Sequence, residues 1–107
     1  MSTAPKSQIL KIADLAAYQE GSVVSRQITK TDGGNVTLFA FDAGQELSEH
    51  TAPYDALVHI LDGEAEVRIS GVSYSLAAGE AILMPANEPH ALKATKQFKM
   101  LLTMVRT

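Results

Sequence analysis

The sequence predicts an all-β protein of one domain, and three observations lead to this prediction. First, a chain of 107 residues that is 46% hydrophobic has the size of one ordinary domain. Second, from residue 22 onward β-branched and aromatic residues occur in short runs that are typical of strands. Third, turn dipeptides separate these runs at nearly regular intervals. Such strands must cover their edges, as a sandwich or a closed barrel does, and periodicity does not choose between the two.

Residues 1–21 are expected to form an N-terminal arm, and residues 22–107 the single β domain. Within the arm, apolar residues recur at helical spacing between Ile9 and Gln19, where Asp14 is a suitable cap for a short turn over residues 15–18. Gly21 ends this segment. The polar residues 1 to about 8 are expected to be frayed.

The first two strands are predicted to form a hairpin. The runs 23–28 and 36–41 flank Asp32-Gly33-Gly34-Asn35. Glycine accepts the positive φ that tight hairpin turns demand, so we expect these glycines to adopt it.

A second hairpin is predicted around Asp62-Gly63. The apolar run 57–61 precedes this dipeptide, and in residues 64–70 apolar side chains alternate with polar ones. An Asp-Gly pair between two such runs is a strong local hairpin signal.

The remaining strands follow at short intervals. Ser70-Gly71 is predicted to turn the chain into a strand over residues 72–76, which Ala78-Gly79 then interrupts. Residues 81–84 form a short apolar strand that Pro85 stops, and residues 98–105 form the closing strand. The methionines of these strands are expected in the core or in a pocket wall.

Composition argues against several classes of function. The net charge is −3, and the nine Lys and Arg residues are not clustered, which argues against nucleic acid as a partner. No stretch approaches the ~20 apolar residues of a membrane span, and no basic segment followed by an apolar run begins the chain. We therefore expect a soluble cytoplasmic protein without a membrane partner. The absence of cysteine excludes a disulfide framework, a thiolate metal site and a cysteine nucleophile.

Three histidines, His50, His59 and His90, are the candidates for chemistry, because histidine is both the commonest metal ligand and the commonest acid–base group near neutral pH. A lone histidine on a strand is nevertheless more often a packed or surface residue. On its strand His59 has the parity of Leu57 and the opposite parity to Ala56, so it is expected to face away from any pocket that Ala56 faces.

Two segments around the other histidines resemble the motifs of the cupin family. The cupin first motif is a glycine, five residues, His-x-His, three or four residues, Glu, six residues and a glycine, and Gly44, His50 and Gly63 match it. The second motif is a glycine, five residues, Pro-x-Gly, two residues, His, three residues and Asn, which Gly79, Pro85 and His90 match in order. The resemblance covers residues 22–105.

The resemblance implies a fold and an assembly. It implies a small antiparallel β-barrel of the double-stranded β-helix or jelly-roll type, with a ligand pocket inside. Many single-domain cupins pair through their sheets, so a homodimer is implied by analogy.

The departures from the family pattern concern the metal. In the family, two histidines and a glutamate from the first motif and one histidine from the second hold a divalent ion. Here Ala52 and Ala56 stand at two of these positions, and Ala94 replaces the asparagine that closes the second motif. Asn87 replaces a glycine at a turn position, where Asn tolerates unusual backbone angles.

Three functions are compatible with this incomplete set of metal ligands. The first is a small-molecule-binding cupin with a metal-poor pocket and an unidentified ligand. The alternative is a metal-dependent enzyme, dioxygenase-like or isomerase-like, with one divalent transition metal as cofactor. The third is a structural or interaction module with a vestigial pocket. The sequence assigns no catalytic residue and no other cofactor-binding motif. The expected pocket residues are His50, Ala52, Tyr54, Ala56, Val58 and His90.

A metal held by His50 and His90 would need a third protein ligand. On an uninterrupted strand Glu46 shares the face of His50, which makes it the favoured carboxylate. Asp55, beside the missing glutamate, is the other candidate, but Pro53 is expected to break the parity between His50 and that position.

Overall fold

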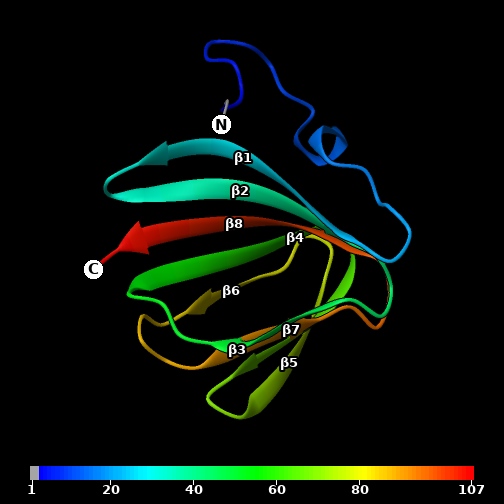
Figure 1. The fold of residues 1–107 in the computed structure, drawn as a ribbon, viewed down its shortest axis with the longest axis vertical. Coiled ribbons are helices and arrows are strands. Elements are labelled where there is room, and N and C mark those ends of the chain that lie inside the picture. Colours follow the sequence, from blue (N-terminus) through cyan, green and yellow to red (C-terminus); the bar gives the residue numbers. More distant parts are fainter. Residues whose placement is uncertain (1–2) are drawn as a thin grey trace.

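The computed structural model describes residues 3–107, which form eight strands and one short helix (Figure 1). Its elements in chain order are the 3-10 helix η1 (Ile12–Leu15) and the strands β1 (Val23–Thr31), β2 (Gly34–Phe41), β3 (Glu46–His50), β4 (Tyr54–Ile69), β5 (Val72–Ala77), β6 (Ala81–Met84), β7 (His90–Lys93) and β8 (Phe98–Arg106). Among these residues no helix is long and apolar enough to cross a membrane.

The strands form one antiparallel sheet in the order β1-β2-β8-β4-β7-β3, with β5 and β6 also paired to β4. The sheet curls into two layers (Figure 1). The large layer contains β1, β2, β8, β6 and the first half of β4, and the small layer contains β3, β7, β5 and the second half of β4. The predicted all-β jelly-roll barrel is therefore confirmed.

The hairpin predicted at Asp62-Gly63 is wrong, because β4 continues through this dipeptide as one strand of 16 residues. The strand bends there instead and passes from the large layer to the small layer. Its register with β8 shifts between Ile60 and Asp62, and Gly63 has a φ of +75°. A Cβ at Gly63 would lie 1.9 Å from the carbonyl oxygen of Gln97, so β8 passes too close for any side chain here.

The first hairpin is confirmed, but its glycines do not act as predicted. Thr31 pairs with Gly34, and the loop between them is Asp32-Gly33. Neither glycine of this loop region has a positive φ. Gly34 is required for another reason: a Cβ there would lie 2.0 Å from the carbonyl oxygen of Met104 on β8.

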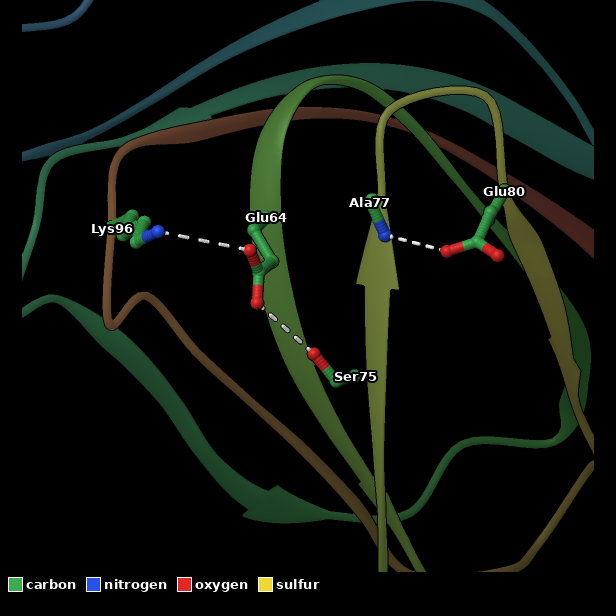
Figure 2. Close-up of polar contacts among 5 residues, drawn as sticks. All are labelled: Glu64, Ser75, Ala77, Glu80 and Lys96. Carbon is green, nitrogen blue, oxygen red and sulfur yellow. Dashed lines mark hydrogen bonds and ion pairs between the residues drawn. The ribbon is translucent and has the colours of Figure 1, made fainter.

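The later turns agree with the sequence. Ser70 and Gly71, with φ of 49° and 82°, join β4 to β5 through the predicted two-residue turn. After β5 the Glu80 carboxylate accepts a hydrogen bond of 2.8 Å from the Ala77 N–H, which closes the turn into β6 (Figure 2). On the neighbouring strand Glu64 accepts a bond from the Ser75 hydroxyl (Figure 2). Strands β6 and β8 lie where they were predicted, whereas β7 was not predicted.

Apolar side chains from both layers fill the space between them. Phe41 and Phe98, both fully buried, stack with ring centroids 4.4 Å apart. Met84 and Met100 also lie in this core, as expected. The rest of the buried cluster is Ala56, Val58, Ile60, Ala65, Val67, Leu76, Leu92 and Ala94.

The arm packs on the outer face of the large layer. Ala16 is 4% exposed and lies with Leu38 and Ala40 in a second, smaller cluster. The helical turn is residues 12–15 rather than 15–18, and Asp14 lies inside it instead of capping it. The arm is also tied down nearer its start, because the buried Ala4 donates its N–H to the carbonyl of Ile28. The expected fraying therefore does not hold at Ala4, and residues 1 and 2 lie outside the described residues.

One polar cluster fixes the end of the arm. The Tyr18 hydroxyl donates a hydrogen bond of 2.5 Å to Asp62, and the Lys99 ammonium donates to the carbonyl of Ala13. Burial and the Asp62 carboxylate raise the pKa of Tyr18 above its ordinary value. The hydroxyl therefore stays protonated and keeps donating to Asp62 throughout the neutral range.

Candidate functional site

His50 and His90 lie next to each other across strands β3 and β7. The register pairs the two residues directly, and their imidazole rings meet edge to face with centroids 4.4 Å apart. His90 is 5% exposed, whereas His50 is exposed. The two histidines singled out in the sequence thus form one pair, in which the His90 side chain is buried and the His50 side chain is exposed to solvent.

A bulge in β3 sets the direction of His50. Leu47 pairs with Leu92 and His50 with His90, so three steps along β3 match two steps along β7. The extra residue breaks the alternation of faces. His50 therefore lies on the inner face with Leu47, while Glu46 pairs with Lys93 on the outer face. The prediction that Glu46 shares the face of His50 is wrong for this reason.

Each imidazole of the pair is held by a backbone carbonyl two residues earlier. The Nδ1 of His50 lies 2.7 Å from the Ser48 oxygen, and the Nδ1 of His90 lies 3.1 Å from the Glu88 oxygen. A carbonyl only accepts, so each Nδ1 carries the proton and donates it. In the neutral rings each Nε2 atom then carries a lone pair, with which it can bind a metal or accept a hydrogen bond.

The environment keeps His90 neutral. Burial is the largest influence and lowers the pKa of His90 below its ordinary value; the Glu88 carbonyl opposes this effect, and the neighbouring His50 adds to it. His90 therefore presents an uncharged ring at neutral pH.

Stability is expected to fall as the pH decreases from 7.5 to 5, because the unfolded chain binds a proton at His90 before the folded protein does. The His90 contribution is at most about 1.4 kcal/mol per pH unit, the limit for one proton. Urea unfolding at several pH values measures it. His90→Gln should flatten this pH dependence, whereas His59→Gln on the opposite face should retain it. Equal slopes for the wild type and His90→Gln would contradict the prediction.

The other expected pocket residues lie at different depths. Ala56 is 2% exposed and Val58 is fully buried, both on the inner face of β4. Ala52, in the segment between β3 and β4, and Tyr54, the first residue of β4, are half-buried. His59 lies on the opposite face of β4 from Ala56, as its parity predicted. That these residues line a ligand pocket remains a prediction.

Asp55 has a role that the sequence did not reveal. Its carboxylate accepts a 2.9 Å hydrogen bond from the N–H of Ala86, and the Ala52 carbonyl accepts one of 2.8 Å from the N–H of Asn87. Both bonds tie the loop before His90 to the segment after His50. Asn87 has a φ of 65°, in keeping with the tolerance expected of asparagine. Asp55 thus helps to hold the loop before His90 against the segment after His50.

A hollow of about 210 Å³ lies on the outer face of the small layer. Its lining includes Glu46, Glu49, Glu66, Arg68 and Lys93. Ala91, between Arg68 on β4 and the β3 bulge, is small and leaves the space open. The sheet separates this hollow from the histidine pair. Local sequence patterns did not indicate it, because its lining residues come from three strands.

The donor set does not fit a resident metal ion. Within residues 3–107 no group of three or more His, Cys, Asp and Glu side chains is placed to hold one. His50 and His90 supply two nitrogens, Glu46 lies on the other face, and the Asp55 carboxylate binds backbone. A catalytic ion ordinarily takes three protein ligands.

Sequence and structure comparisons agree with this architecture. A family model described as "Cupin domain" matches residues 37–106. The chain belongs to the cupin family. A search of curated proteins found no match to this cupin.

Several solved structures are similar to this chain over most or all of its length. A conserved protein of unknown function from Streptococcus pyogenes is 35% identical, with a TM-score of 0.92, over 100% of this chain and 96% of that one. A cupin superfamily protein from Desulfitobacterium hafniense is 28% identical, with a TM-score of 0.91. The match covers 99% of this chain and 97% of that chain. A predicted oxalate decarboxylase from Thermotoga maritima is 16% identical, with a TM-score of 0.76. The match covers 81% of this chain and 83% of that chain, and it shows a shared fold alone.

Proposed function

We propose that this cupin binds a small polar molecule at the imidazole pair of His50 and His90. The observation that carries the proposal is the pair itself. The two ring centroids lie 4.4 Å apart, and in each ring the Nδ1–H donates to a backbone carbonyl while Nε2 is left to accept. Preset acceptors at the edge of an apolar interior are the usual elements of a ligand site.

The chemistry of the pair indicates the class of ligand. A neutral His90 accepts hydrogen bonds, so it suits a ligand that donates them through hydroxyl or amine groups. Protonation of His90 would remove its acceptor, so the affinity for such a ligand should fall as the pH decreases. An anionic ligand would show the opposite trend, because it favours the charged rings.

Thermal unfolding in the presence of a library of polyols, phenols and small amines tests the proposal. A compound at 100 times its dissociation constant stabilises by about 2.7 kcal/mol. For a domain of this size each 1 kcal/mol raises the melting temperature by roughly 4–8 °C. We expect at least one compound to stabilise the wild type and His59→Gln but not His50→Gln or His90→Gln. A library without any such compound would overturn the proposal.

A separate measurement addresses the metal-dependent alternative. No observation in residues 3–107 supplies the third ligand that an enzyme of this kind needs. Elemental analysis of protein purified without chelator gives the direct measurement. A stoichiometric transition metal that is lost in His50→Ala would replace the proposed function with metal-dependent chemistry.

A further inference from the structure

A row of directly paired residues connects the histidine pair with strand β5. His50 pairs with His90, and His90 pairs with Ile69 on β4. Ile69 in turn pairs with Val72 on β5. Directly paired residues of an antiparallel sheet point to the same face, so all four side chains lie on the inner face of the small layer. The imidazoles therefore stand at one end of a row whose other end is apolar.

The apolar end of this row is open to solvent. The inner-facing side chains of β5 are Leu76, Tyr74 and Val72, and their exposed fractions rise from 5% to 41% and 53% toward the turn with β4. Leu76 belongs to the buried core, whereas the tip of this hairpin projects away from the large layer (Figure 1). Ile69 is half-buried beside them. The three residues Ile69, Val72 and Tyr74 are here called the inner strip, and none of them is charged at neutral pH.

Hydrogen bonds fix the inner strip relative to His90. The turn after Ile69 begins with Ser70, whose N–H donates a 2.8 Å hydrogen bond to the Pro89 carbonyl. The Ser70 hydroxyl donates a second bond, of 3.3 Å, to the Glu88 carboxylate. Because Pro89 precedes His90 in the chain, these bonds join the turn between β4 and β5 to the start of β7. The inner strip and the imidazole pair are therefore held in one fixed arrangement.

We propose that the ligand held by the imidazole pair is an alcohol or a phenol whose uncharged apolar body lies on the inner strip; the proposal rests on the function proposed above. Neighbouring strands are about 4.8 Å apart, so His90 and Val72, two strands apart, are separated by roughly 10 Å. A linear molecule of that length reaches from the imidazoles to β5. Exposed apolar side chains beside a few polar groups are typical of ligand grooves.

The chemistry of the row favours a hydroxyl group over other heads and an apolar body over a polar one. A neutral His90 accepts a hydrogen bond from a hydroxyl group. The four paired residues include no carboxylate, so an ammonium group would find no opposite charge among them. A polyol would place further hydroxyl groups against Ile69 and Val72, whose side chains offer them no partner. An apolar body instead covers surface that water now contacts.

NMR titration of the histidine ring signals with phenol, 4-ethylphenol and 4-butylphenol tests this assignment. Each fully buried methylene group tightens binding about fourfold, and one that lies on an open strip should contribute less. We expect the dissociation constant of the wild type to fall at least about tenfold from phenol to 4-butylphenol. This dependence on chain length is measured in the wild type and needs no variant.

The double variant Val72→Thr/Tyr74→Thr removes most of the apolar surface of the inner strip and keeps β-branched residues, which suit a strand. It should bind phenol as the wild type does but lose the gain from the butyl chain. Leu83→Thr is the matched control, because Leu83 is 58% exposed on the outer face of the large layer, and it should keep that gain. Circular dichroism should show that both variants remain folded, since the replaced side chains are exposed.

The outcomes separate this proposal from the function on which it rests. If the phenols leave the ring signals unchanged while a polyol or an amine shifts them, the proposed function stands and this class of ligand is wrong. If none of these compounds shifts them, the proposed function fails as well. If phenol binds but the chain length has no effect, the inner strip is not part of the site. A gain that persists in the double variant would place the chain on another surface and would also overturn the proposal.

Discussion

Gly63→Ala is expected to lower the free energy of unfolding by about 2–5 kcal/mol. Two costs add at this residue. An L side chain at a φ of +75° costs roughly 1–2 kcal/mol. The new methyl group would also meet the Gln97 carbonyl oxygen at 1.9 Å, and forcing backbone apart in a packed structure costs about 1–3 kcal/mol. The melting temperature should fall by roughly 10–30 °C, measured by thermal and urea unfolding.

Gly71→Ala separates the two costs. Gly71 has a φ of +82°, but no atom lies within 4 Å of the position that a Cβ would take. Gly71→Ala should therefore lower the free energy of unfolding only by the conformational cost of about 1–2 kcal/mol. Equal losses at both glycines would show that the approach of β8 at Gly63 is relaxed without cost. A larger loss at Gly63 would show that the close approach of Gln97 adds to the conformational cost.

These glycines also show how far local sequence patterns predict the fold. Ser70-Gly71 and Asp62-Gly63 carry similar turn signals between runs of apolar residues. The first is a hairpin turn, whereas the second is a bend inside β4. What decides between them is the passage of Gln97 beside Gly63, a contact between residues far apart in the sequence. Alternation and turn residues therefore predicted most strands, but not the strand that both layers share.

The same limit applies to the site. The motif spacings indicated that His50 and His90 belong together, and the register of β3 with β7 places them side by side. Glu46 was assigned to their face by strict alternation, which one bulge residue in β3 reverses. The role of Asp55 depends on its hydrogen bond to Ala86, on a loop that only the fold brings near. The identity and order of the chemical groups were readable from the sequence. Parity also placed His59 on the correct face of an uninterrupted strand, but it failed for Glu46 across the bulge.

The double variant Ala52→His/Ala56→Glu is expected to bind Co²⁺ at least ~100-fold more tightly than the wild type. The cupin pattern places metal ligands at these two positions, beside the histidines that this chain retains. Two imidazoles alone make a weak site, whereas two more ligands complete the tetrahedral or larger set that divalent ions prefer. Absorption of bound Co²⁺ in the visible range measures both affinity and coordination.

The burial of Ala56 makes a second, independent prediction for this variant. Ala56 is 2% exposed, so a glutamate there places a carboxylate in the apolar interior. Without metal that charge is costly, and the melting temperature in chelator should be lower than that of the wild type. Metal binding to the folded form should then restore stability, because the ion both pairs with the charge and binds only the assembled site.

Ala52→His/Ala56→Gln is the matched control, since glutamine has a similar volume but supplies no charged ligand. It should bind Co²⁺ less tightly than the glutamate variant and should gain little stability from it. If all three proteins bind Co²⁺ equally weakly, the histidine pair does not stand where the family holds its metal. If the glutamate variant alone binds tightly, the barrel has kept the shape of a metal centre. The two alanines would then be sufficient to account for the weak donor set of the natural chain, and a ligand would be free to bind the imidazoles directly.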